Sequence, residues 1–335
     1  MLDRRQFLRR STAAVVLPLT GGCSRPGPWS RAAYRKQERS RVAILTAVRY
    51  DGALVDTIRQ GIRLFGLEVG GKHVVLKPNI IEYVPTNPAV TTNPAVVAAA
   101  AEAFRQLGAR EVTVAEGPGH RRDTDYLLTA SGFHAAIRAV GSRWVDLNHD
   151  DVVSVPAPSH YTRFGRFYLP TTVAEADLLV SMPKLKTHHW AGMTGALKNM
   201  FGILPGAIYG WPKNPLHWAG IHESILDINA ALTVPQFAIV DGIVGMEGDG
   251  PIRGEPKSAG VLIFGDDLVA VDATAARVMG MEPARVKYLK HAEEFLGNLA
   301  VDRIVQVGET LERVQSNFRV IEPFEYLKVA GSKLS

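Results

Sequence analysis

Residues 73–115 read HVVLKPNIIEYVPTNPAVTTNPAVVAAAAEAFRQLGAREVTVA, and this stretch decides the fold. Its first part, 73–77, is a short apolar run that predicts a buried strand. The pair Asn93-Pro94 is typical of a helix cap and first turn, so the Ala-rich segment that follows predicts a helix over 93–107. A second apolar run at 111–115 predicts another strand. This order favours two parallel strands joined by a helical crossover.

The same alternation continues on both sides of this stretch. Further apolar runs predict strands at 42–45, 177–181, 237–241 and 261–264, and periodic segments predict helices at 51–65, 216–231 and 268–279. Residues 142–170 are richer in Pro, aromatic and β-branched residues, which favours a small antiparallel insertion. We therefore predict an α/β fold, a mostly parallel sheet covered by helices.

The N-terminus resembles a twin-arginine export signal. Arg4-Arg5-Gln6-Phe7-Leu8 precedes an apolar run at 13–19, which is too short to span a membrane stably. The alternative is a basic N-terminus beside a chance apolar run. The signal implies the twin-arginine machinery as a partner and a location in the periplasm or on the outer face of the membrane. Gly21-Gly22-Cys23 partly resembles a lipoprotein cleavage site, so a lipid on Cys23 stays open.

The chain divides into four predicted segments. These are a signal at 1–23, a linker at 24–40, an α/β domain at 41–285 and a C-terminal extension at 286–335 that packs on it.

The basic charge of the chain belongs to its N-terminus. The formal net charge is +5, but residues 41–335 hold 29 basic and 31 acidic residues. Because this domain shows no basic stripe with interleaved aromatics, we expect no nucleic-acid binding. Cys23 is the only cysteine. If the mature domain does not retain a free Cys23, it contains no thiol. It can then have no intrachain disulfide, no cysteine nucleophile and no Cys-ligated iron–sulfur cluster.

The segment richest in chemistry is 183–206, PKLKTHHWAGMTGALKNMFGILPG, and its first residues are expected to form a polar loop after the strand at 177–181. It combines lysines, which carry charge to phosphate or carboxylate, with histidines and with glycines that let backbone approach a ligand. A helix beginning near Thr194 would add its N-terminal amides. The predicted catalytic residues are His188, Lys198 and Lys184, and the predicted anion-binding residues are Lys77, Asn79, Lys186, Thr194 and Gly195. The alternative is a solvated lysine pair on a surface loop.

Lys77 and Asn79 enter this set because they follow a strand. In open α/β sheets, ligands bind beyond the carboxyl ends of the strands. Polar residues there also arise simply because chains turn there.

A divalent metal is the candidate cofactor. Asp241, Glu247 and Asp249 lie on a Gly-rich segment after a strand, and His217 lies near a predicted helix start. The predicted metal ligands are His217, Asp241 and Glu247, since hard cations prefer oxygen ligands and imidazole suits several metals. Solvated acids on a plain glycine loop are the alternative. The sequence contains no GxGxxG, Walker A or GxSxG motif, so dinucleotide binding, P-loop phosphoryl transfer and serine hydrolysis lack support.

The chain resembles the family called domain of unknown function 362. The matching pieces are KPN at 77–79, TTNPAVVAAAAEAF with GAREVTVAEG at 91–117, PKLKTH at 183–188, GALKNMFGILPG at 195–206, VDGIVGMEGDGP at 240–251 and GDDLVAVDATAARVMG at 265–280. Some members resemble ferredoxin fusions with extra cysteines, which this chain lacks.

A shorter stretch, HHWAGMTGALK at 188–198, is similar to a segment of the nickel-pincer lactate racemases. That resemblance implies that Lys198 carries or contacts the cofactor, that His188 does acid–base work and that His217 faces the metal. The gap to Pro205-Gly206 is three residues longer than in that family.

Three functions follow. The first is an exported enzyme that binds an anionic small molecule, a carboxylate or a phosphorylated compound, through a Lys/His/Gly-rich cleft, with metal assistance. The second is a non-catalytic extracytoplasmic binding protein that uses the same cleft. The third is an accessory factor for an exported cofactor enzyme.

Overall fold

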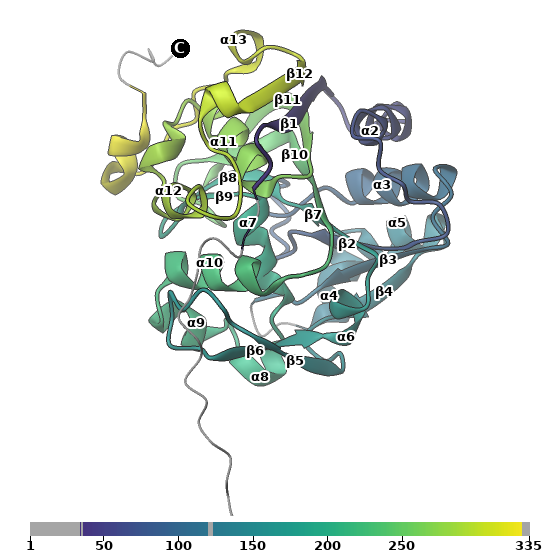
Figure 1. Ribbon diagram of the computed structural model, residues 1–335. Helices are drawn as coiled ribbons and strands as arrows, with labels where there is room; N and C mark the ends of the chain where they lie inside the picture. Colours follow the sequence, from purple (N-terminus) through teal and green to yellow (C-terminus); the bar gives the residue numbers. More distant parts are fainter. Residues whose placement is uncertain (1–33, 35, 120–122, 330–335) are drawn as a thin grey trace, which may run out of the picture.

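The computed structural model describes residues 34, 36–119 and 123–329 (Figure 1). The predicted export signal, Cys23 and most of the predicted linker lie outside the described residues.

A mixed sheet forms the centre of the fold. In the described part of the chain it has ten strands, eight of them in the order β12-β1-β11-β10-β7-β2-β3-β4, with β8 pairing with β10 and β9. The strands are β1 (Ser40–Thr46), β2 (His73–Pro78), β3 (Glu111–Glu116), β4 (Arg143–Asp146), β7 (Leu178–Met182), β8 (Lys184–His188), β9 (Gly192–Thr194), β10 (Gln236–Glu247), β11 (Glu255–Gly265) and β12 (Ile304–Gly308). Along the sheet order β10-β7-β2-β3-β4, each strand runs parallel to its neighbour, whereas β11 is antiparallel to both β1 and β10. The predicted mostly parallel α/β sheet is confirmed.

A second, two-stranded sheet is antiparallel. It pairs β5 (Val152–Pro156) with β6 (Arg166–Pro170), which confirms the predicted insertion within 142–170.

Helices cover both faces of the large sheet (Figure 1). They are α2 (Leu54–Arg63), α3 (Pro94–Gln106), α4 (Thr124–Ala130), α5 (Phe133–Ala139), α6 (Thr171–Ala174), α7 (Ala196–Asn199), α8 (Gly206–Tyr209), α9 (Asn214–Trp218), α10 (Ile221–Ala231), α11 (Leu268–Val278), α12 (Lys287–Ala292) and α13 (Leu311–Val314). The alternation of side chains along each strand divides the core in two. Val74 and Leu76 pack towards α2, α3 and α5, and Val75 between them packs into the core that α7, α10 and α11 share.

Local chemistry explains where two of these helices begin. The side chain of Asn93 accepts a hydrogen bond from the backbone N–H of Ala95, as the predicted cap requires. Asp267 caps α11 by accepting from the N–H groups of Val269 and Ala270.

Three expectations about local structure were wrong. The polar segment after the 177–181 strand was expected to be a loop, but it is the buried strand β8. The strand expected to end at Asp241 continues to Glu247, because β11 pairs with it as far as Glu247 and β8 pairs with it at Asp241 and Met246. The helix expected over 216–231 is broken at Gly220, whose φ of 103° is incompatible with a right-handed helix.

The segment after residue 286 contributes to the same sheet. Its strand β12 pairs in parallel with β1 at the sheet edge. None of the helices in the described ranges is long and apolar enough to cross a membrane.

Candidate functional site

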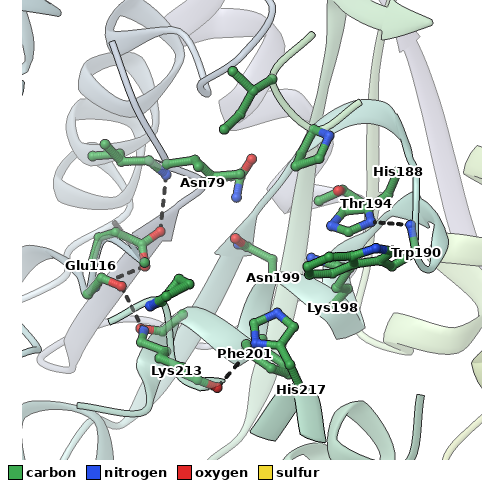
Figure 2. Close-up of a pocket in the computed structure, with 18 of the residues that line it drawn as sticks. Asn79, Glu116, His188, Trp190, Thr194, Lys198, Asn199, Phe201, Lys213 and His217 are labelled. Carbon is green, nitrogen blue, oxygen red and sulfur yellow. Dashed lines mark hydrogen bonds between the residues drawn. The ribbon is translucent and has the colours of Figure 1, made fainter. Parts of the chain in front are cut away.

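A cavity of about 230 Å³ opens beyond the carboxyl ends of β2, β3 and β8 (Figure 2). This is the edge at which ligands bind in open α/β sheets. Its lining combines three lysines, three histidines and one carboxylate with apolar and amide groups. The lining residues are Lys77, Asn79, Ile80, Ile81, Glu116, Gly117, Gly119, His188, His189, Trp190, Thr194, Lys198, Asn199, Phe201, Gly202, Pro212, Lys213, His217, Pro251 and Ile252.

A buried ion pair forms one wall of the cavity. Lys77 Nζ lies 2.5 Å from Glu116 Oε2, and both side chains are almost fully buried. The ammonium group also donates to Asn199 Oδ1 at 2.8 Å and to the Pro78 carbonyl at 2.9 Å. Lys77 therefore has an acceptor for each of its three protons, and its charge is balanced locally.

Lys213 is held by the backbone. Its Nζ donates to the carbonyl oxygens of Gly117 and Gly202, at 2.7 and 2.8 Å. Burial lowers the pKa of Lys213 to about 7, an effect that Glu116 opposes and Lys77 reinforces. Because a neutral amine still has two protons, both carbonyl hydrogen bonds can persist in either charge state.

Lys198 is the cavity lysine that remains available. It lies on α7, and its Nζ has no hydrogen-bond acceptor among the residues that the structure describes; it sits 5.9 Å from the centre of the Phe201 ring. Burial, and then the nearby charge of Lys77, lower the pKa of Lys198 to about 8. An anion that entered the cavity would give this ammonium group a partner.

His188 presents a proton donor. Its Nδ1 accepts hydrogen bonds from the backbone N–H groups of Trp190 and Ala191, at 3.1 and 3.3 Å. A nitrogen that accepts cannot carry the proton, so the neutral ring carries it on Nε2. Burial, and then Lys198, lower the pKa of His188 well below its ordinary value, which keeps the ring neutral.

His217 presents the opposite nitrogen. Its Nδ1 lies 3.1 Å from the Lys213 carbonyl, which can only accept, so Nδ1 carries the proton and Nε2 has a free lone pair. Burial lowers the pKa of His217, so this ring is also neutral near pH 7. Trp190 contacts this ring edge-on at 5.4 Å between centroids, and Phe201 contacts it at 4.9 Å. In Figure 2 His188 and His217 lie on either side of Lys198.

Two polar atoms in the lining have no partner in the part of the chain that the structure describes. Asn79 Oδ1 and Thr194 Oγ1 are buried and form no hydrogen bond with any described residue. Since buried polar groups are almost always satisfied, these two atoms are suited to bind a ligand.

Several predicted site residues lie elsewhere. Lys184 is completely buried and pairs with Asp241 at 2.6 Å, and it also donates to the hydroxyl of Tyr50 at 3.1 Å. Lys186 donates to the Val90 carbonyl at 2.6 Å and has no carboxylate partner, so burial lowers its pKa well below the ordinary value. These lysines are not part of the cavity lining.

The amides at the start of α7 are also occupied. The helix begins at Ala196, and the carboxylate of Asp272 accepts from the N–H groups of Ala196 and Leu197. Gly195 is required there because a Cβ would come within 2.3 Å of that carboxylate. The carboxyl group of Asp272 therefore occupies the amides that were predicted to bind a ligand anion.

The three predicted metal ligands do not lie together. His217 lines the cavity, whereas Asp241 pairs with Lys184 and Glu247 pairs with Arg319 at 2.7 Å. In the described ranges, no group of three His, Cys, Asp or Glu side chains is placed to hold a metal ion. The resemblance to nickel-pincer lactate racemases implies three site residues that do line this cavity, namely His188, Lys198 and His217. Of these, His217 offers an unprotonated Nε2 whose lone pair is of the kind that binds a metal.

The cavity residues that are absent from the predicted set include Glu116, Asn199 and Lys213. Glu116 follows a strand and was visible as polar, but nothing marked it as the partner of Lys77. Asn199 neighbours Lys198 on α7. Lys213 lies between Pro212 and the helix that bears His217. Its position beside a candidate site residue was the one sequence feature that could have identified it.

Comparisons with known proteins give one curated relative and two solved structures that are similar to this chain. Thylakoid-associated protein sll1697 of Synechocystis is 25% identical over 296 residues, which cover 84% of this chain and 88% of that protein. The lactate racemase apoprotein of Thermoanaerobacterium thermosaccharolyticum is 15% identical with a TM-score of 0.42, covering 78% of this chain and 58% of that one. A Thermotoga maritima protein is 14% identical with a TM-score of 0.38, covering 64% and 56%. The chain thus spans less than two thirds of either solved structure. A family model matches residues 74–277, and the chain belongs to the family described as Domain of unknown function (DUF362).

Proposed function

We propose that this DUF362 protein is an exported enzyme. It binds a small carboxylate or phosphate anion in the cavity and catalyses a proton transfer on the bound molecule. The observation that carries the proposal is the pair of neutral histidines with complementary Nε2 atoms on one cavity, beside Lys198, which has no hydrogen-bond acceptor in the described ranges.

The charge of the lining favours an anion. Glu116 balances Lys77, which leaves Lys198 as the main cationic group and Lys213, whose pKa is about 7, as a partly charged one. An ammonium group in a partly dehydrated cavity attracts an anion far more strongly than it would in water. Asn79 and Thr194 supply further polar contacts that orient the ligand.

The two histidines suit acid–base chemistry. His217 Nε2 can take a proton from the bound anion, and His188 Nε2–H can donate to the oxygen on which negative charge then develops. Their lowered pKa values keep both rings in the required neutral state at pH 7. A neutral imidazole is an effective hydrogen-bond donor when its pKa is depressed.

Export rests on the paired arginines and short apolar run at the N-terminus. A folded enzyme would then work in the periplasm or on the outer face of the membrane.

The test begins with the full chain purified through its own export pathway. Mass spectrometry of released small molecules, with metal analysis of the same sample, identifies a retained ligand. Turnover of that compound is then compared in the wild type and in His188→Gln, with His222→Gln as the control because His222 lies outside the cavity.

An enzyme loses kcat in His188→Gln and keeps most of its affinity, while His222→Gln is unaffected. Ligand binding without turnover in any form would replace the enzyme with a binding protein. A protein that retains no small molecule and co-purifies with an exported cofactor enzyme would be an accessory factor.

A further inference from the structure

A second cavity, of about 190 Å³, lies behind α7 and away from the candidate site. It is enclosed by the end of α10, the start of β10 and the start of α11. Its lining residues are Lys36, Gln37, Leu197, Asn229, Gln236, Asp266, Asp267, Leu268, Val269 and Leu296.

Three oxygen atoms of this lining are buried and have no hydrogen-bond partner among residues 34, 36–119 and 123–329. They are Asn229 Oδ1, Gln236 Oε1 and Asp266 Oδ1. Unsatisfied buried acceptors are costly, so three around one cavity point to an occupant that carries positive charge or donates protons.

The orientation of Asn229 is fixed by its neighbours. Its Nδ2 donates to the carbonyl oxygens of Leu197 and Ile225, at 2.9 and 2.8 Å. The amide cannot be flipped without losing both hydrogen bonds, so the atom without a partner is truly the oxygen. The side chain is only 4% exposed.

The donors that line this cavity are partly used. Lys36 donates one of its three protons to the Glu293 carbonyl, and Gln37 donates to Asp266 Oδ2. The positive end of α11 is neutralised by its cap Asp267, which accepts hydrogen bonds from four donors. The buried lining atoms that lack a partner in the described part of the chain are all oxygens, one of them from a carboxylate.

We propose that this cavity binds a small hard metal cation through Asn229, Gln236 and Asp266. Carboxylate and amide oxygens, completed by water, are the ligand set that such cations prefer. Cation binding at this cavity does not require the proposed enzymatic activity.

The cation would also support the candidate site. Asn229 holds the carbonyl of Leu197, and the next residue on α7 is Lys198. Filling the cavity would therefore stabilise the helix that presents Lys198.

The experiment measures the unfolding temperature of the full chain, stripped with a chelator, in chlorides of calcium, magnesium, sodium and potassium. Tetramethylammonium chloride at the same ionic strength is the reference. At about 100-fold excess over its Kd, a cation bound only by the folded state should raise the Tm by roughly 5 °C. Calorimetric titration of the same cation gives its stoichiometry.

Asp266→Asn removes the charge, and Gln236→Met removes one oxygen at similar volume. Asp302→Asn, at an exposed acid elsewhere, is the matched control. We expect the Tm increase to disappear in Asp266→Asn, to shrink in Gln236→Met and to persist in Asp302→Asn. Absence of any cation-specific increase in the wild type, or an equal increase in all variants, would overturn the proposal and leave a water-filled cavity.

Discussion

Lys198 should react with an acylating reagent over an unusual pH range. Burial and the charge of Lys77 lower its pKa from 10.5 to about 8. At pH 8 about half of this amine would be neutral, against about 0.3% for a lysine with the ordinary pKa. Intrinsic nucleophilicity falls with pKa, so we expect a net rate advantage of roughly tenfold.

The assay is competitive labelling with a small isotopic acetylating reagent from pH 6 to 11, followed by peptide mass spectrometry. The exposed Lys290 provides an internal comparison. The rate at Lys198 should reach half of its maximum near pH 8, and that midpoint does not depend on nucleophilicity. Added sulfate should move the midpoint upwards, because a bound anion stabilises the ammonium form.

A midpoint for Lys198 above pH 10, unmoved by sulfate, would refute the reasoning. It would mean that the amine is hydrated and does not face a desolvated cavity.

Three further outcomes are expected. Glu116→Gln leaves the ammonium group of Lys77 buried without its counter-ion, so urea unfolding should show a loss of about 3–5 kcal/mol; a loss below 1 kcal/mol would contradict the ion pair. Burial raises the pKa of Asp272 from 3.8 to about 7, so folding favours its protonated form. The stability that this group contributes is therefore present below about pH 4 and lost as the pH rises to 7, and urea titrations should show that Asp272→Asn removes this slope; an unchanged slope would contradict it. Replacing both Arg4 and Arg5 by Lys should keep the protein in the cytoplasmic fraction, and normal export of this variant would exclude the twin-arginine signal.

The sequence was sufficient for the sheet and its main helices because their signals are local. Apolar runs mark the strands that are buried on both faces, and Asn93 before Pro94 marks the start of α3. The periodic pattern over 216–231 predicts one helix, but the helix is interrupted at Gly220. The interruption depends on the positive φ angle of this glycine, which cannot be read from the sequence.

The strand β8 could not be recognised in this way. Its lysines and histidine resemble a surface loop, yet all five residues are buried. Lys184 is tolerated there only because Asp241, 57 residues later, supplies a counter-ion at 2.6 Å. Such pairing is a tertiary property, so a buried polar strand looks exposed until its partner is known.

The candidate site was predicted in part for the same reason. His188, Lys198, His217, Asn79 and Thr194 do meet at one cavity. Lys184 and Lys186 lie close to Lys198 in the sequence but do not line the cavity. Asp241 pairs with Lys184, and the Val90 carbonyl accepts a hydrogen bond from Lys186, so both side chains are held elsewhere. Residue type and spacing mark reactive side chains, but the partners that neutralise them come from other elements.

The most direct measurement is a calorimetric titration of sulfate and acetate into the full chain at pH 7. Wild type and Lys198→Met are compared, with Lys290→Met as the control for loss of one positive charge. A charge-assisted hydrogen bond contributes about 1.5–3 kcal/mol, so we expect Lys198→Met to weaken binding of the preferred anion by roughly 10- to 150-fold and Lys290→Met to leave it unchanged. Equal affinity in all three proteins, or no binding of either anion to the wild type, would contradict an anion site at this cavity.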